Sequence, residues 1–165
     1  MRWQQLILVL APAFACVTDA SLTLYGQPAE YWAGDTSVAN EMSPEPRKLL
    51  AISPAIFLLA VVGWISALAF LVVCTRRLTA TVLSCSVTIA HASGAATWIL
   101  WSLQYGYQLT ILLQLVSGTI LAISICHVMK RPHKVSRYLL FPAAIYRATV
   151  FILLCAILFM FLVPH

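Results

Sequence analysis

Five long apolar runs, joined by short polar segments, constrain the fold of this chain more than any other feature of its sequence. A membrane-spanning helix needs about 20 predominantly apolar residues, because each residue adds only about 1.5 Å along the helix axis. The five runs meet this length and cover residues 3–25, 48–74, 78–102, 109–129 and 138–163. We therefore predict an all-α transmembrane bundle of five helices in a single integral membrane domain, residues 1–165, with an outer loop at residues 26–46.

The composition favours a membrane protein and argues against other classes. Hydrophobic residues make up 62% of the 165 residues and charged residues only 9%, whereas a soluble domain has about 25% charged residues. The net charge of +5 comes from small basic groups between the apolar runs, which is typical of topology determinants and does not indicate nucleic-acid binding. No cysteine belongs to a CxxC pair, so a thiol-redox or zinc motif is absent. We expect no metal and no cofactor. The five cysteines all lie in or at the end of apolar runs: Cys16, Cys74, Cys85, Cys126 and Cys155.

The first apolar run has two interpretations. Arg2, an apolar stretch and the small residues Ala13 and Ala15 together fit a secretory signal peptide. We favour a retained helix, because the apolar run continues past that cleavage motif to Tyr25 without a break. Pro12 would kink such a helix, which a membrane bundle tolerates. With cleavage, the bundle would have four helices instead of five.

The segment 26–46 is the only long polar stretch between the runs. It contains no basic residue and four of the chain's five carboxylates, Glu30, Asp35, Glu41 and Glu45. Their spacing matches no calcium-binding loop, so we predict a solvated loop. Tyr31 and Trp32 within it are typical of the membrane–water interface.

The basic residues predict the orientation of the bundle. Arg2, Arg76 and Arg77 fall on the same side as the segment 130–137, and the acidic loop falls on the other side. We therefore expect the N-terminus inside and the C-terminus outside, in a plasma (bacterial inner) membrane. Two basic residues at the outer start of the second run are exceptions, Arg47 and Lys48. The basic segment is also expected to contact anionic lipid through Lys130, Arg131, Lys134 and Arg137.

Residues 84–98 of the third run are unusually small and weakly polar for a membrane helix. At 3.6 residues per turn, one helix face carries Ser84, Thr88, His91, Ala95 and Trp98. The opposite face carries Ser86, Ala90, Ser93 and Thr97. Such a helix offers little apolar surface to lipid, so we predict that it lies at the centre of the bundle.

Polar residues inside the runs are the best pointer to function, since an ionisable side chain there costs about 2.5–3.5 kcal/mol. Measured from the inner end of each run, Asp19 lies at about 24 Å, His91 at about 20 Å and Gln114 at about 22 Å. We predict that these three form one polar layer, joined by Thr18, Thr88 and Ser117. The layer has two interpretations: structural contacts that fix helix register, which we favour, or a ligand or proton site.

Arg147 in the fifth run lies at about 14 Å on the same scale. Its long side chain can reach the inner headgroups, pair with Asp19 or bind a lipid phosphate. In a second interpretation, residues 137–146 lie at the interface and the fifth crossing begins near Arg147.

Catalytic arrangements fit the sequence poorly. A bis-histidine haem would need His91 and His127 at one depth, and they differ by about 17 Å. The string around Ser93 lacks the first glycine of the rhomboid GxSG pattern, and His91 points to the opposite helix face. We therefore expect a non-catalytic protein.

Three short motifs carry a resemblance: Asp19-x-x-Leu22-Thr23, Glu41-x-x-Pro44 and His91-x-x-Gly94-x-x-Thr97-Trp98. With them, the chain resembles small uncharacterised bacterial multi-pass membrane proteins, which have no assigned activity. The resemblance draws attention to Asp19, Glu41 and His91 without implying a role for them.

The sequence thus favours an accessory or assembly subunit of a membrane complex. Its expected partners are the lipid bilayer and other membrane proteins or further copies of itself. The alternative is a small transporter or proton- or ion-conducting protein that uses the layer of Asp19 and His91.

Overall fold

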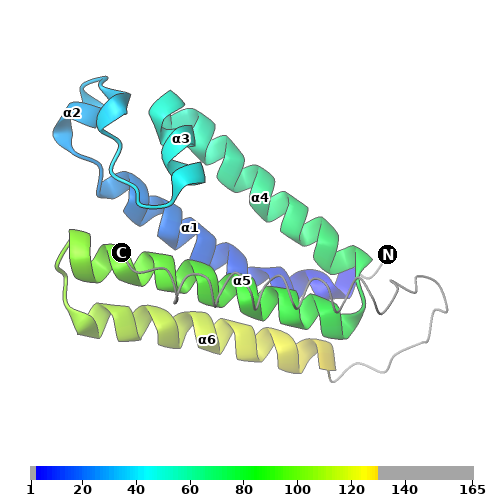
Figure 1. The fold of residues 1–165 in the computed structure, drawn as a ribbon. Coiled ribbons are helices and arrows are strands. Elements are labelled where there is room, and N and C mark those ends of the chain that lie inside the picture. The colour runs from blue at the N-terminus through cyan, green and yellow to red at the C-terminus, as the bar shows by residue number, and fades with distance from the viewer. Residues whose placement is uncertain (1–2, 130–165) are drawn as a thin grey trace, which may run out of the picture. The chain divides into compact units, whose positions relative to one another are not determined.

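The computed structural model describes residues 3–129, and in this part of the chain all regular structure is helical (Figure 1). The elements are η1 (Trp3–Val9), α1 (Leu10–Tyr25), α2 (Ala29–Trp32), η2 (Thr36–Val38), α3 (Pro44–Ile52), α4 (Pro54–Cys74), α5 (Arg77–Thr97), the π-helical turn η3 (Trp98–Ser102) and α6 (Tyr107–Met129). Four helical segments are long and apolar enough to cross a membrane: Gln4–Tyr25, Pro54–Cys74, Arg77–Ser102 and Tyr107–Met129. The predicted fifth span, 138–163, lies outside the described residues.

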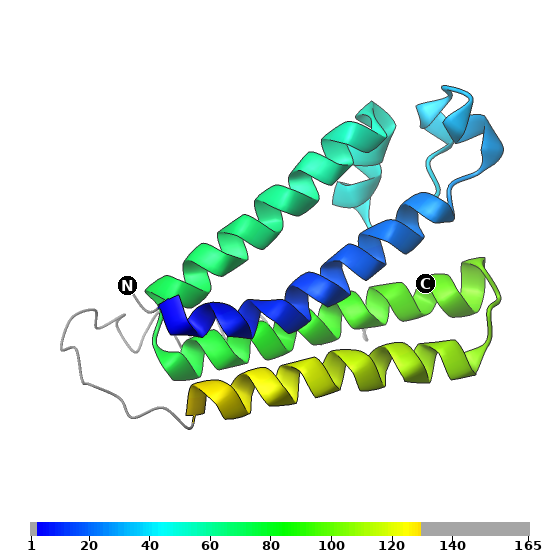
Figure 2. The ribbon, with the colours of Figure 1, turned by 180° about the vertical axis from the view of Figure 1, so that it is seen from behind.

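Helices α1 and α5 form the centre of the described bundle. Each contacts the other and also contacts both α4 and α6. Both views place α4 and α6 on opposite sides of this central pair (Figures 1 and 2). The position of α5 agrees with the prediction made from its small side chains.

The interior of the central pair is built from small side chains. Small residues let helix backbones approach closely, which favours helix association in lipid. On α1 the buried residues include Ala11, Ala15, Cys16 and Ala20. On α5 they are Ala80, Ser84, Val87, Thr88, Ala92, Ala95 and Ala96.

Helix α6 contacts this pair through a seam with a seven-residue repeat. Three buried hydroxyl residues, Thr110, Ser117 and Ser124, follow one another at this interval. Leu113 and Val128 complete the buried seam. A seven-residue repeat keeps one narrow stripe of a helix facing its neighbour, as in a coiled coil. The rest of α6 is therefore left outside the described core.

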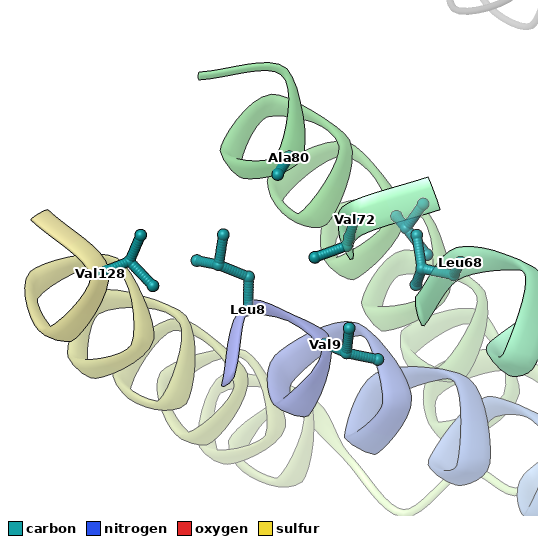
Figure 3. Close-up of a cluster of buried hydrophobic side chains, with 7 residues drawn as sticks. Leu8, Val9, Leu68, Val72, Ala80 and Val128 are labelled. Carbon is teal, nitrogen blue, oxygen red and sulfur yellow. The ribbon is translucent and has the colours of Figure 1, made fainter. Parts of the chain in front are cut away.

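One end of the bundle is closed by an apolar cluster around Leu8. Leu8 is fully buried, and Figure 3 shows it between Val128 of α6 and Val72 of α4. The side chain of Gln5 donates a hydrogen bond of 3.0 Å to the backbone oxygen of Val72. These contacts fix η1 and the last turns of α4 together.

The second span is shorter than the predicted run of 48–74, which is a correction to the sequence prediction. Ser53 is extended and separates α3 from α4, which begins at Pro54. Proline lacks the N–H that a continuous helix needs, and it disfavours helical geometry in the residue before it. The Ser53 side chain instead accepts a hydrogen bond from the backbone N–H of Ile56, 3.1 Å away, and caps α4.

The break leaves carbonyl groups of α3 without their usual helical donors. Pro54 cannot donate to the oxygen of Leu50, and the Tyr31 hydroxyl donates to it instead, at 3.0 Å. The Thr36 hydroxyl donates to the oxygen of Ala51, at 2.6 Å. The carbonyl group of Leu50 is buried and needs such a partner. Together the two bonds join the end of α3 to the segment before it.

Residues 26–53, which we name the cap, therefore form a folded unit where the sequence analysis predicted a solvated loop up to residue 46. The Gln27 side-chain amide donates to the oxygen of Asn40 at 2.9 Å and accepts from its backbone N–H at 2.8 Å. Tyr31, predicted at the membrane–water interface, is buried, whereas the neighbouring Trp32 is exposed. A hydrophobic cluster joins the cap to the spans and comprises Ala20, Tyr31, Ala39, Leu50 and Phe57.

Candidate functional site

Asp19 of α1 and His91 of α5 meet across the central helix pair. The distance from His91 Nδ1 to Asp19 Oδ2 is 2.8 Å. The side chain of His91 is 26% exposed and that of Asp19 is 21% exposed, so the pair is mostly but not completely buried. Both residues lie within helices that are long and apolar enough to span a membrane.

A third helix contributes Trp64, which the sequence analysis did not identify. Its indole Nε1–H donates to His91 Nε2 across 3.2 Å. An indole nitrogen can only donate, so Nε2 must be the acceptor and must carry no proton. The proton of the neutral imidazole is then on Nδ1, from which it is donated to Asp19. A carboxylate, an imidazole and an indole thus form one hydrogen-bonded chain through α1, α5 and α4.

Gly94 makes the close approach of Asp19 to α5 sterically feasible. A Cβ atom added at Gly94 would lie 2.8 Å from Asp19 Oδ1 and 2.9 Å from Oδ2. Real Cβ atoms essentially never come this close to another heavy atom. Only glycine at this position leaves room for the carboxylate beside the helix, one turn after His91.

Cys16 also lies at the site. It is buried on α1, one turn before Asp19, and lies near the imidazole of His91. In the sequence, Cys16 stands out only as one of five cysteines in apolar runs, and its helical spacing from Asp19 was the available signal that both face His91.

Gln114, the third member of the predicted layer, does not join the pair. Its side chain is exposed on α6, and it makes no hydrogen bond within the described part of the chain. The depth estimate placed Gln114 at the right height but carried no information about rotation around the helix axis. The inward seam of α6 is occupied at this height by Leu113 and Ser117.

The hydroxyl groups expected to connect the layer bond within their own helices or are left without a partner. Thr88 donates to the oxygen of Ser84 at 2.7 Å, and Thr18 donates to that of Phe14 at 2.9 Å. Ser117 is buried, and its hydroxyl has no hydrogen-bond partner among residues 3–129. The described site is therefore the chain of Asp19, His91 and Trp64.

The remaining predicted contact residues are all beyond the described part of the chain. They are Lys130, Arg131, Lys134, Arg137 and Arg147. Within residues 3–129, no group of three or more histidine, cysteine, aspartate or glutamate side chains is placed to hold a metal ion.

Chemically, this arrangement can hold three helices together or exchange a proton between carboxylate and imidazole. Comparison of the chain with protein-family models, with curated proteins and with solved structures finds no match. The geometry of the site and of the helices around it therefore carries the functional argument.

Proposed function

We propose that the protein is a non-catalytic multi-pass integral membrane protein that serves as an accessory or assembly subunit of a membrane complex. The carrying observation is that both ring nitrogens of His91 are engaged by side chains of other helices, Asp19 of α1 and Trp64 of α4. A neutral imidazole with both nitrogens engaged has none left for a metal ion or a substrate. This use of the polar interior favours a role in holding helices together.

The surfaces of the outer helices support a role in binding within the membrane. Helices α4 and α6 expose many large apolar side chains, including Leu59 and Phe70 on α4 and Leu115 and Ile123 on α6. Apart from short turns, the described residues outside the spans form only the small cap. Helix contacts and lipid contacts are then the main means by which such a protein acts.

The membrane topology that we propose has five spans, with the N-terminus inside and the C-terminus outside a plasma (bacterial inner) membrane. The packing of α1 against α4, α5 and α6 supports a retained first helix. The two basic residues that were exceptions to the charge rule belong to α3, which precedes the shortened second span. One of them, Lys48, pairs with Glu45 at 2.6 Å, which weakens its effect as a topology signal.

The accessory role is tested by purifying the full chain at its natural expression level in a mild detergent. We expect a second membrane protein to co-purify at a fixed stoichiometry, measured by native mass spectrometry. A preparation from untagged cells serves as the control for adventitious binding. Recovery of the chain with lipid alone, or only with further copies of itself, would contradict the accessory role.

A proton- or ion-conducting protein is the second candidate, and the partial exposure of Asp19 and His91 favours it. It predicts a proton flux into liposomes that contain the purified protein, above the flux into empty liposomes. Asp19→Asn and His91→Gln should each lower this flux, because each removes a group that can carry the proton. Equal fluxes in protein-containing and empty liposomes would contradict this candidate.

A further inference from the structure

Helix α4 packs against the rest of the described bundle through two apolar clusters, one toward each of its ends. At one end Phe57 belongs to the apolar cluster of the cap, and at the other Leu68 and Val72 pack around Leu8. Between these ends, one face of the helix is uncovered: Leu59 is 67% exposed and Val62 60% exposed. On either side of Trp64, Val61 and Ile65 are partly buried and pack against the same two clusters, so the apolar contacts of α4 reach to within one turn of Trp64.

Trp64 supplies a polar contact between these two clusters. Among the described residues, it is the only side chain of α4 that hydrogen-bonds a side chain of another helix. The indole is itself 47% exposed, so only part of the ring is packed. The bond to His91 therefore adds a specific polar attachment of α4 to its apolar contacts.

This attachment requires the neutral form of His91. When the imidazole is protonated, both ring nitrogens become donors. Nε2 then presents an N–H to the N–H of Trp64, and no acceptor remains between them. The contact on the other side of the ring persists, because Nδ1 donates to Asp19 in both forms and the charged ring forms an ion pair with the carboxylate.

We propose that Trp64 latches the middle of α4 to the α1–α5 pair while His91 is neutral, and that protonation of His91 releases it. Among residues 3–129, the titratable groups that face the imidazole are Asp19 and Cys16, both from α1. Helix α4 contributes Trp64, which does not titrate, and the titratable residues of α6 lie near its two ends, far from His91. The latch goes beyond the accessory role and does not depend on it.

The proposal predicts that acidification moves one helix pair and leaves the other unchanged. Full-length protein in lipid nanodiscs would carry spin labels introduced through non-canonical amino acids, so that the native cysteines stay in place. Labels at Leu59 and Ile89 report the distance between α4 and α5, and labels at Val17 and Ile89 report that between α1 and α5. All three positions are more than half exposed. On acidification, the first distance should lengthen and the second should stay the same.

Two variants separate the latch from a general effect of pH. Trp64→Phe keeps an aromatic ring but lacks the N–H, so α4 should be released at every pH. His91→Gln keeps an acceptor but does not titrate, so its distances should not respond to pH. The protonation of His91 itself is followed in the same samples through the nitrogen chemical shifts of its ring.

Several outcomes would overturn the latch. One is an α4–α5 distance that stays constant while His91 becomes protonated, or a His91 that never protonates over the scanned range. Another is a wild-type distance in Trp64→Phe at alkaline pH. A pH response that persists in His91→Gln would also overturn it, since the movement would then depend on another group. None of these outcomes bears on whether another protein co-purifies with the chain.

Discussion

Helices α4 and α5 have the same length, 21 residues, but they differ in polarity and in burial. Helix α4 is the more apolar of the two and is the less buried, whereas the more polar α5 lies at the centre. The buried residues of α4 are large and apolar, as in Phe57 and Leu68. Those of α5 are alanine, serine and threonine, with a single valine.

This difference indicates which interactions would organise the described bundle in a lipid bilayer, which its four long apolar helices are suited to cross. Lipid chains are as apolar as leucine, so apolar side chains gain little by moving from lipid into a helix interface. Small residues gain close backbone packing, and polar groups gain partners that lipid does not offer. The side chains of α5 therefore determine where the core lies, and those of α4 determine what faces outward.

The largest effect on stability is expected when one glycine in each helix is replaced by leucine. Gly94→Leu on α5 would place a side chain where Asp19 now lies, and overpacking of this kind costs about 3 kcal/mol. Gly63→Leu on α4 is the matched control, because no atom lies within 4 Å of a Cβ added there. Its stability should change by less than about 1 kcal/mol. Thermal unfolding in detergent, followed by circular dichroism, measures both variants.

Equal stability losses in the two glycine variants would break the contrast between the helices. A stable Gly94→Leu protein would further mean that Asp19 can leave the site without cost. Spin labels on α1 and α5 would then show whether the two helices have moved apart.

A smaller effect is expected at the cap, which holds one end of α4. Tyr31→Phe removes the hydroxyl that donates a hydrogen bond to the oxygen of Leu50. That oxygen is then left without a donor, because Pro54 has no N–H. The loss should be about 1–2 kcal/mol, measured as faster hydrogen exchange of cap amides. Glu30→Gln, at an exposed neighbouring position, should leave this exchange unchanged. Wild-type exchange in Tyr31→Phe would mean that apolar packing alone holds the cap.

The same tyrosine makes the cap sensitive to alkaline pH. Burial raises the pKa of Tyr31 above its usual value, because the folded cap disfavours the phenolate. Its contribution is therefore fully present below the unfolded pKa of about 10 and is lost as the pH rises through the higher folded value. Tyr31→Phe should lack this alkaline loosening.

The smallest expected effect compares two serines on the seam of α6. Ser117 is buried without a described partner, whereas the Ser124 hydroxyl donates to the oxygen of Ile120 at 2.8 Å. Ser117→Ala should leave stability unchanged or raise it by about 0.5 kcal/mol, and Ser124→Ala should lower it by about 0.5–1 kcal/mol. Thermal unfolding of both proteins measures the difference. A clear loss in Ser117→Ala would indicate that this hydroxyl has a partner in the intact protein.

The sequence predicts the features of this molecule that depend on length, composition and height along a helix. Apolar runs give the described spans, small residues identify the central helix, and a depth count places Asp19 level with His91. It does not predict Trp64, since an aromatic residue in a span looks the same whether it faces lipid or a histidine. Gln114 was misplaced for the related reason that height says nothing about rotation.

The cap was missed for a different physical reason. The segment lacks apolar periodicity, and its structure depends on single polar contacts that no composition reveals. Pro54 was the usable signal: a proline inside an apolar run requires a helix boundary, and the orphaned carbonyl of Leu50 then needs a donor such as Tyr31. A proline removes the N–H donor of the carbonyl group four residues earlier. If each proline in the sequence is examined for this loss, the second span is predicted to be shorter.

The shared space of Gly94 and Asp19 also ties the evolution of two positions that lie far apart in the chain. Because a Cβ at position 94 and a carboxylate at position 19 cannot coexist without a shift, position 94 is not free to take a larger residue while Asp19 is unchanged. In related sequences, a larger residue at position 94 should occur only with a smaller one at position 19. Joint variation at these two sites would then identify relatives that keep this helix pair after other similarity has faded.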